Sequence, residues 1–222
     1  MQLKDRKVIV TGGPTREWID PVRFISNPSS GKMGVAIAQA ATKFGCETVF
    51  IHGPIESKVL ENTHCKTKSI ESTHELLEAV VSELQDYAVL IMAAAPADYK
   101  PLNTSDKKIK KSGGDLTLQL IKNPDILKEV ALMRAAGTFS SLFVAGFAAE
   151  THNVEEYAKQ KLTGKNLDMI CLNDVSKEHA GFGSDTNTVI IYNKNGTQKQ
   201  LPIDTKEIIG NSIIDYIHSI LK

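Results

Sequence analysis

Three uninterrupted runs of apolar residues constrain the fold of this chain more than any other feature. They occupy residues 8–10, 88–92 and 142–145. Short, continuous apolar runs are typical of parallel strands that are buried on both faces. Helical patterns at residues 33–41 and 75–85 lie between them, and strands that alternate with helices form a parallel sheet. We therefore predict an α/β fold, Rossmann-like and doubly wound around a mostly parallel sheet, with all 222 residues in a single domain.

The remaining elements are predicted from shorter signals. The turn Asn193-Lys194-Asn195-Gly196 lies between two apolar stretches and predicts a C-terminal β-hairpin. Further strands are expected at residues 47–51, 65–70, 116–120 and 167–173, of which 116–120 alternates like a half-exposed strand.

Two helix beginnings are also predicted. Asn123 is the expected N-cap of one helix, with Pro124 at its first helical position. Asp204 to Glu207 form a capping pattern for the last helix. Its expected buried face consists of Ile208, Ile209, Ile213, Ile214, Ile217 and Leu221.

Composition excludes several classes of protein. The 26 basic residues are balanced by 26 acidic ones, which argues against a general binder of nucleic acid or of membrane surfaces. No apolar run reaches the eighteen or so residues of a membrane span, and no secretory leader is visible, so we expect a soluble, cytoplasmic protein. The three cysteines lack metal-ligand spacing and are expected to be reduced thiols.

The connection after the first strand is unusually long. About twenty residues separate Gly12 and Gly13 from the helix that begins near Met33, and long loops in compact domains are usually functional or disordered. Apolar anchors such as Trp18 and Phe24 favour an ordered, functional loop. Its end supplies hydroxyls, backbone N–H groups and a cation at a helix N-terminus, where anions are bound. The resulting candidate phosphate-binding loop comprises Gly12, Gly13, Asn27, Ser29, Ser30, Gly31 and Lys32, without the spacing of a Walker loop.

Later strand ends carry further candidates. The run at 88–92 is followed by small residues and then by Asp98, and Phe147 follows the run at 142–145. Open α/β sheets bind ligands at this edge. Four lysines surround Ile109 and precede a Gly-Gly pair, so we predict a mobile lysine flap within residues 100–122. The second strand ends without the acidic residue that holds the ribose of nicotinamide dinucleotides, which argues against an NAD(P)-dependent oxidoreductase.

Taken together, the motifs resemble one family. The segments GGPTREWIDPVRFISNPSSGKMG, AAAPADYKP, KKIKK, NPDIL, GFAAET, KLTGKNLD and CLND occur in the order found in phosphopantothenate–cysteine ligases, and the resemblance covers roughly residues 6–220. It implies a bacterial-type reaction in which CTP, with a divalent cation such as Mg²⁺, activates 4′-phosphopantothenate as an acyl-cytidylate. Cysteine then forms the amide and CMP is released.

The resemblance also implies roles for particular residues. Asn27 matches the family's catalytic asparagine, Arg23 a nearby functional arginine, and Lys108 the lysine of the flap. The positions that match the family's CTP contacts are Met92, Ala93, Ala94, Asp98, Lys108, Pro124, Asp125, Ile126, Leu127, Phe147, Lys161 and Lys165. The metal ligands stay open, with Asp98 as one candidate.

The expected partners are the three small substrates and a second copy of the chain, since the family implies a homodimer. Residues 116–120 are a candidate exchange surface. A flavin-binding decarboxylase domain usually precedes this domain in bacteria and is a possible partner, so the sequence is expected to be a stand-alone ligase or an excised domain. Two alternatives are the oxidoreductase named above and a nucleotide sensor without catalytic activity.

Overall fold

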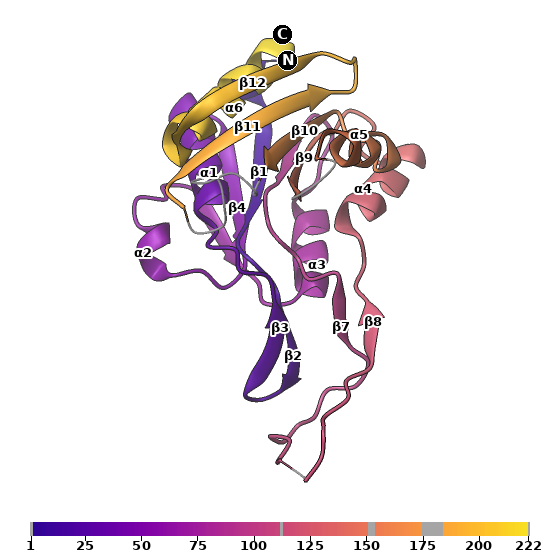
Figure 1. Cartoon of the computed structure of the whole chain (residues 1–222). Helices are drawn as coiled ribbons and strands as arrows, with labels where there is room; N and C mark the ends of the chain where they lie inside the picture. Colours follow the sequence, from indigo (N-terminus) through magenta and orange to yellow (C-terminus); the bar gives the residue numbers. More distant parts are fainter. Residues whose placement is uncertain (1, 112, 151–153, 175–183, 222) are drawn as a thin grey trace.

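The chain folds around an eight-stranded sheet (Figure 1). This computed structural model describes residues 2–111, 113–150, 154–174 and 184–221, so Thr151 of the GFAAET motif lies outside the described residues. The strand order is β12-β11-β10-β9-β6-β1-β4-β5. The six strands from β10 to β5 are parallel, and only β11 and β12 are antiparallel. The strands are β1 Lys7–Gly12, β4 Glu47–His52, β5 Lys66–Ser69, β6 Val89–Met92, β9 Phe143–Glu150, β10 Met169–Asp174, β11 Thr186–Asn193 and β12 Gln198–Thr205.

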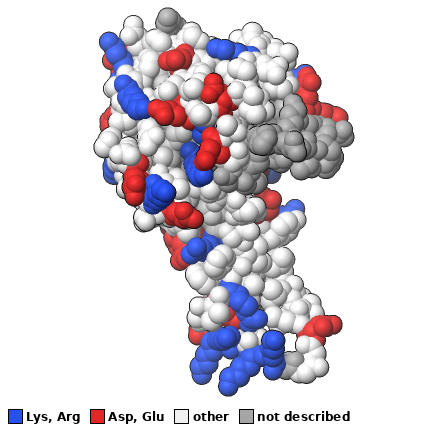
Figure 2. All heavy atoms as spheres, turned by 60° about the vertical axis from the view of Figure 1, so that its left-hand side comes forward, with Lys and Arg blue, Asp and Glu red and all other residues white. Residues whose placement is uncertain are grey.

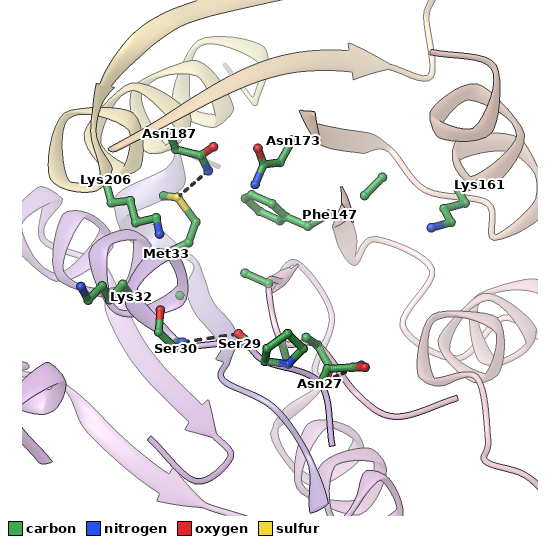
Figure 3. Close-up of a pocket in the computed structure, with 17 residues that line it drawn as sticks. Asn27, Ser29, Ser30, Lys32, Met33, Phe147, Lys161, Asn173, Asn187 and Lys206 are labelled. Atoms are coloured by element: carbon green, nitrogen blue, oxygen red, sulfur yellow. Dashed lines mark hydrogen bonds between the residues drawn. The ribbon is translucent and has the colours of Figure 1, made fainter. Parts of the chain in front are cut away.

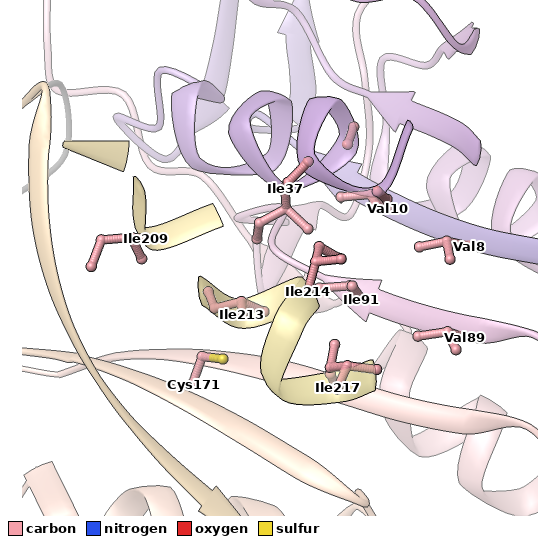
Figure 4. Close-up of a cluster of buried hydrophobic side chains, with 14 of the residues drawn as sticks. Val8, Val10, Ile37, Val89, Ile91, Cys171, Ile209, Ile213, Ile214 and Ile217 are labelled. Carbon is pink, nitrogen blue, oxygen red and sulfur yellow. The ribbon is translucent and has the colours of Figure 1, made fainter. Parts of the chain in front are cut away.

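Helices cover both faces of this sheet. The helical elements are η1 Leu3–Asp5, α1 Lys32–Phe44, α2 Ser57–Leu60, α3 Thr73–Glu83, α4 Ile126–Ala135, α5 Val154–Gly164 and α6 Lys206–Ile220. On one face, α1 and α6 bury Ile37, Ile213 and Ile217 against alternate residues of the central strands (Figure 4). On the other face, α3, α4 and α5 cover the residues in between, such as Ile9 and Leu90. The predicted doubly wound α/β fold is therefore confirmed.

The C-terminal hairpin and helix form as expected, with one correction. Strands β11 and β12 pair in antiparallel register, and the Thr205 hydroxyl accepts a hydrogen bond from the Ile208 N–H at the start of α6. Ile208 was assigned to the buried face, but 47% of it is exposed. It lies in the first turn of α6, where the neighbouring Ile209 is buried as predicted.

Two small hairpins extend away from the sheet and share one end of the molecule (Figure 1). The first consists of β2 Arg16–Asp20 and β3 Arg23–Ser26, so the long first connection contains strands that the sequence did not predict. The second pairs β7 Tyr99–Pro101 with β8 Leu120–Lys122. The prediction of a strand at residues 116–120 is wrong, since only Leu120 of this range is in a strand. Its alternating pattern has no sheet to pack on, and Leu116 and Leu118 stay exposed.

The start of α4 also differs from the prediction. Asp125, rather than Asn123, is the N-cap, and its carboxylate accepts a hydrogen bond from the Lys128 N–H at 3.3 Å. The side chain of Asn123 instead donates to the carbonyl of Ala97 at 2.9 Å. The helix therefore begins after the Asn-Pro pair, and this pair lines a cavity.

Close backbone contacts hold the first connection against the sheet. The Gly53 N–H donates to the carbonyl of Gly12 at 3.0 Å, and the Ala95 N–H donates to that of Gly13 at 2.9 Å. A Cβ atom added to Gly34 would lie 2.8 Å from the Cα of Gly12, so α1 packs on the end of β1 with no side chain between them. These contacts fix the beginning of α1 at the end of the central strands.

Candidate functional site

The first of two adjoining cavities lies where the strand order reverses. Within the eight-stranded sheet, β1 pairs on one side with β4, the next strand of this sheet along the chain, and on its other side with β6. In open α/β sheets the carboxyl ends at such a reversal form the ligand-binding crevice. A cavity of about 350 Å³ occupies this place (Figure 3). Its lining residues are Asn27, Pro28, Ser29, Ser30, Gly31, Lys32, Met33, Gly34, Ala93, Ala94, Ala95, Phe147, Ala148, Lys161, Asn173, Asn187 and Lys206.

The beginning of α1 forms one wall of this cavity. Gly31 is the N-cap in a left-handed conformation (φ 75°), which glycine adopts without strain. Among the described residues no side chain caps the helix, although the Ser29 hydroxyl accepts a long hydrogen bond from the Gly31 N–H at 3.4 Å. The first turn therefore presents backbone N–H groups and the positive end of the helix dipole to the cavity. This is the geometry expected of the predicted phosphate-binding loop.

Asn27 lies at the mouth of the cavity, in a fixed orientation. Its amide nitrogen donates to the carbonyls of Ala95 and Pro96, at 3.2 and 2.9 Å. These residues follow β6, so the side chain joins the first connection to the end of the neighbouring strand. Both amide hydrogens are used in this way, which leaves the amide oxygen as the free acceptor.

Cations line two sides of the cavity. Lys161 extends from α5, and Lys32 and Lys206 lie on the opposite side (Figure 3). The Lys32 ammonium is 2.6 Å from a carboxylate oxygen of Asp185 and holds the pKa of that carboxyl below its usual range. The Lys206 side chain is buried and donates to the carbonyl of Ser184. Burial first, and then the charge of Lys32, lower the pKa of Lys206.

A second cavity of about 150 Å³ adjoins the first and shares Ala94 and Phe147 with it. Lys165 forms an ion pair of 2.9 Å with Asp125 on its wall. The residues that line this second cavity include nine of the twelve positions matched to CTP contacts, namely Met92, Ala94, Asp98, Pro124, Asp125, Ile126, Leu127, Phe147 and Lys165. Ala93 and Lys161 line the larger cavity, so two adjoining cavities bring together eleven of these positions.

Arg23 and Lys108 are not among the residues that line either cavity. Arg23 pairs with the buried Asp20 at 2.5 Å and donates to the carbonyl of Ile109 at 3.1 Å. The Ile109 N–H donates to the same Asp20 carboxylate. The Arg23 guanidinium holds the pKa of Asp20 well below its usual range. This clip joins the two hairpins into one extension, and basic side chains gather at its tip (Figure 2), where Lys107, Lys108, Lys110 and Lys111 are exposed.

Within the described ranges, no three side chains of His, Cys, Asp or Glu come together as a metal site. A magnesium ion that is bound mainly through phosphate oxygens needs only one or two carboxylates from the protein. Asp98, at the smaller cavity, fits that need. In the same ranges no helix has the length and apolar character required to span a bilayer.

Three polar residues of the larger cavity were not predicted as site residues: Asn173, Asn187 and Lys206. Asn173 ends a parallel strand beside β9, so the strand-end argument used for Phe147 would have found it. Its amide oxygen is buried and accepts no hydrogen bond from a described residue. Asn187 and Lys206 carry no local signal, because they reach the cavity only through the packing of β11 and α6.

The fold and the cavities define a doubly wound α/β protein with a candidate ligand site at the reversal point of its sheet. Residues 3–221 match the family described as DNA/pantothenate metabolism flavoprotein C-terminal domain. The chain belongs to this family, and the resemblance indicated by its motifs is confirmed.

Relatives of known name support this assignment. The chain is 40% identical over 221 residues to the coenzyme A biosynthesis bifunctional protein CoaBC of Vibrio vulnificus (strain CMCP6), covering 99% of this chain and 53% of that protein. The corresponding protein of Escherichia coli (strain K12) is 43% identical over 218 residues, covering 97% and 52%. The chain thus spans about half the length of the curated relatives it matches.

Solved structures agree with the fold. A crystal structure of the C-terminal domain of coenzyme A biosynthesis bifunctional protein CoaBC is 38% identical, with a TM-score of 0.79 and coverage of 97% of this chain and 95% of that one. A Cab2 mutant complex with phosphopantothenate-cysteine has a TM-score of 0.75 over 97% of this chain and 87% of that one, but at 16% identity it shows a shared fold alone.

Proposed function

We propose that this chain is a ligase that joins 4′-phosphopantothenate and L-cysteine during coenzyme A biosynthesis, with CTP as the activating nucleotide. The observation that carries the proposal is the adjoining pair of cavities. They place the uncapped start of α1 and Asn27 beside eleven of the positions matched to CTP contacts. The relatives named CoaBC are coenzyme A biosynthesis proteins, which supports a role in that pathway.

The two cavities suggest a division of the substrates. The smaller cavity, between Met92, Leu127 and the ring of Phe147, suits a flat base. The triphosphate then extends toward the start of α1, whose N–H groups and Lys32 attract anions. The rest of the larger cavity takes the acid substrate, next to Asn27.

The reaction has two steps. In the first, a carboxylate oxygen of 4′-phosphopantothenate attacks the α-phosphorus of CTP, the bond to the β-phosphate bridging oxygen breaks, and pyrophosphate leaves. In the second, the cysteine amine attacks the acyl carbon, loses a proton and releases CMP. The first step brings a carboxylate against a triphosphate, and in the second step negative charge develops on the acyl oxygen and on the departing CMP, so cations and oriented dipoles lower both barriers. A magnesium ion near Asp98 would neutralise phosphate charge when bound.

Asn27 is the group best placed to orient the acyl intermediate. Its amide is fixed by two carbonyls beyond β6 at the mouth of the larger cavity. A fixed amide needs no reorganisation when the acyl group forms, and this preorganisation is what makes polar groups effective in active sites.

The direct test supplies 4′-phosphopantothenate, Mg²⁺ and each nucleoside triphosphate in turn, and measures pyrophosphate release with and without cysteine. We expect release with CTP to stop at about one equivalent per site without cysteine, and to continue when cysteine is added, because the acyl-cytidylate stays bound until the amine arrives. Omitting the acid is the control. If no triphosphate yields pyrophosphate, the proposed reaction is wrong.

Two other functions are separated by simple measurements. A nucleotide sensor would bind CTP without forming product. An NAD(P)-dependent oxidoreductase would change the fluorescence of the reduced nicotinamide on binding. Strand β4 ends in His52, whose ring packs on Phe50, so the described site offers no acidic residue for a ribose at this strand end.

A second copy of the chain would bring the remaining family positions to the site. The extension leads away from the sheet (Figure 1), and its residues Arg23 and Lys108 do not line the two cavities of their own chain. It also exposes apolar side chains that a partner would cover, namely Val22, Phe24, Tyr99, Leu102, Leu116, Leu118, Leu120 and Ile121. We therefore propose a homodimer in which each extension reaches the cavity of the other copy. The cytoplasmic location expected from the sequence stays a prediction.

Mixing two inactive variants tests this arrangement. If Arg23 acts on the partner's site, a mixed dimer of Arg23→Ala and Asn27→Asp chains contains one site with both residues intact. We expect each variant alone to be nearly inactive, and the mixture to recover about a quarter of wild-type activity after exchange, because half of the dimers are mixed and each has one intact site. A mixture that stays inactive, or a fully active monomer in sedimentation, would exclude the arrangement.

A further inference from the structure

Lys206 has a position that its sequence context does not explain. It is the first residue of α6 and lines the larger cavity, yet only 9% of it is exposed. Its ammonium donates to the carbonyl of Ser184, and its backbone N–H donates to that of Asp185 at 3.0 Å. A buried ammonium is costly unless it is neutralised or fully hydrogen-bonded, so this position is unfavourable without a compensating partner.

Within the described residues, no carboxylate forms an ion pair with Lys206. The nearby carboxylate of Asp185 is already paired with Lys32 at 2.6 Å, and 86% of that side chain is exposed. Two lysines therefore share one exposed carboxylate. The pKa of Lys206 is lowered, mainly by burial and then by Lys32, which is the response of a cation that has lost water without gaining an equal counter-charge.

Helices α1 and α6 bring these lysines to the same wall. Both helices begin at the cavity, α1 at Lys32 and α6 at Lys206. They approach closely, because a Cβ atom added to Gly210 would lie 2.8 Å from the carbonyl oxygen of Ala36. Figure 3 shows the Lys206 side chain pointing toward the beginning of α1, where Ser30 and Lys32 lie. Two positive helix ends and two ammonium groups thus act on one small volume.

We propose that Lys206 is an anion-binding residue of this site. Together with Lys32 and the first turn of α1 it holds a phosphate group of the ligand, from the side opposite Lys161. The inference rests on the proposed function, in which both the nucleotide and the acid carry phosphate. An anion at this point supplies the counter-charge that the buried ammonium lacks, and a charge-assisted hydrogen bond to phosphate is among the stronger polar contacts.

Binding of inorganic pyrophosphate, CTP and 4′-phosphopantothenate to the whole chain, measured by calorimetry, tests the proposal. The variants are Lys206→Met, which keeps length without charge, and Lys206→Arg, which restores it. Lys43→Met is the matched control, since Lys43 lies on α1 and pairs with Glu207 of α6 at 2.7 Å in an exposed position. Thermal unfolding without ligand shows whether each variant keeps the fold.

We expect Lys206→Met to weaken the binding of at least one of the three phosphate-containing ligands roughly tenfold to a hundredfold. Lys206→Arg and Lys43→Met are expected to bind all three with affinities close to wild type. Weaker pyrophosphate and CTP binding would assign the subsite to the polyphosphate, and weaker 4′-phosphopantothenate binding alone would assign it to the phosphate monoester. The difference from wild type should shrink as salt is raised, because salt screens charge. A lysine that only anchors Ser184 and Asp185 would not show this dependence.

Wild-type affinity of Lys206→Met for all three ligands would overturn the inference, and so would an equal loss in Lys206→Arg. This failure is distinct from failure of the proposed function, which would show as no CTP binding and no pyrophosphate release by the wild-type chain.

Discussion

Replacing Asn27 with Asp is expected to lower product formation at least about 100-fold, the cost of losing one oriented polar group in an active site. A carboxylate cannot donate to the carbonyls of Ala95 and Pro96, which now hold the amide at 3.2 and 2.9 Å. The side chain would turn away from these oxygens and lose its fixed orientation. CTP binding and the first release of pyrophosphate should stay nearly intact, so the acyl-cytidylate should accumulate.

Rapid-quench measurement of pyrophosphate and of trapped acyl-cytidylate checks this expectation. Asn62→Asp is the matched control, because it makes the same chemical change at an exposed position outside the residues that line the cavities. Unaltered product formation by Asn27→Asp would remove Asn27 from the catalytic step. Loss of CTP binding would instead assign it to nucleotide binding.

Replacing Gly53 with Ala is expected to cause the largest loss of stability, about 3–5 kcal/mol by comparison with other severe backbone and packing conflicts. The added Cβ would lie 1.6 Å from the carbonyl oxygen of Pro14 and 2.8 Å from its carbonyl carbon. Both are backbone atoms, so no side-chain rotation relieves the overlap. The hydrogen bond from the Gly53 N–H to Gly12 would also be strained.

Denaturant unfolding measures the expected loss. Gly164→Ala is the control, since an added Cβ there meets no atom within 4 Å. Pyrophosphate binding should weaken in Gly53→Ala at temperatures where it is folded, because the displaced Pro14 belongs to the connection that leads to the start of α1. An unchanged unfolding midpoint would show that the two segments separate at little cost.

Local patterns predicted most of the fold. The apolar runs at residues 8–10 and 88–92 are buried parallel strands because only strands covered on both faces are apolar throughout. The start of α1 was predicted as an anion site because it is a helix N-terminus, and the small residues after β6 were predicted as a ligand edge because they follow a strand end. Both line the larger cavity. The errors at Asn123 and Ile208 are shifts within one helical turn, where local signals are weakest.

Other features depend on contacts between distant parts of the chain. The clip of Asp20 and Arg23 with the backbone of Ile109 joins segments almost ninety residues apart. No local pattern reports such a pairing, because it depends on the two hairpins leaving the sheet side by side. The alternating pattern at residues 116–120 is misleading for the same reason, since the extension offers it no sheet to cover.

By itself, the sequence determined the doubly wound α/β fold and the membership of the family. Hydrophobic periodicity and helix capping depend on residues that are close in the sequence, so they can be recognised without knowledge of the tertiary structure. The tertiary structure alone decided that Lys206 and Asn187 enter the cavity and that Arg23 and Lys108 do not. The physical reason is that helical spacing gives the face on which a residue lies, whereas the close contact of Gly210 with Ala36 sets where α6 begins along α1.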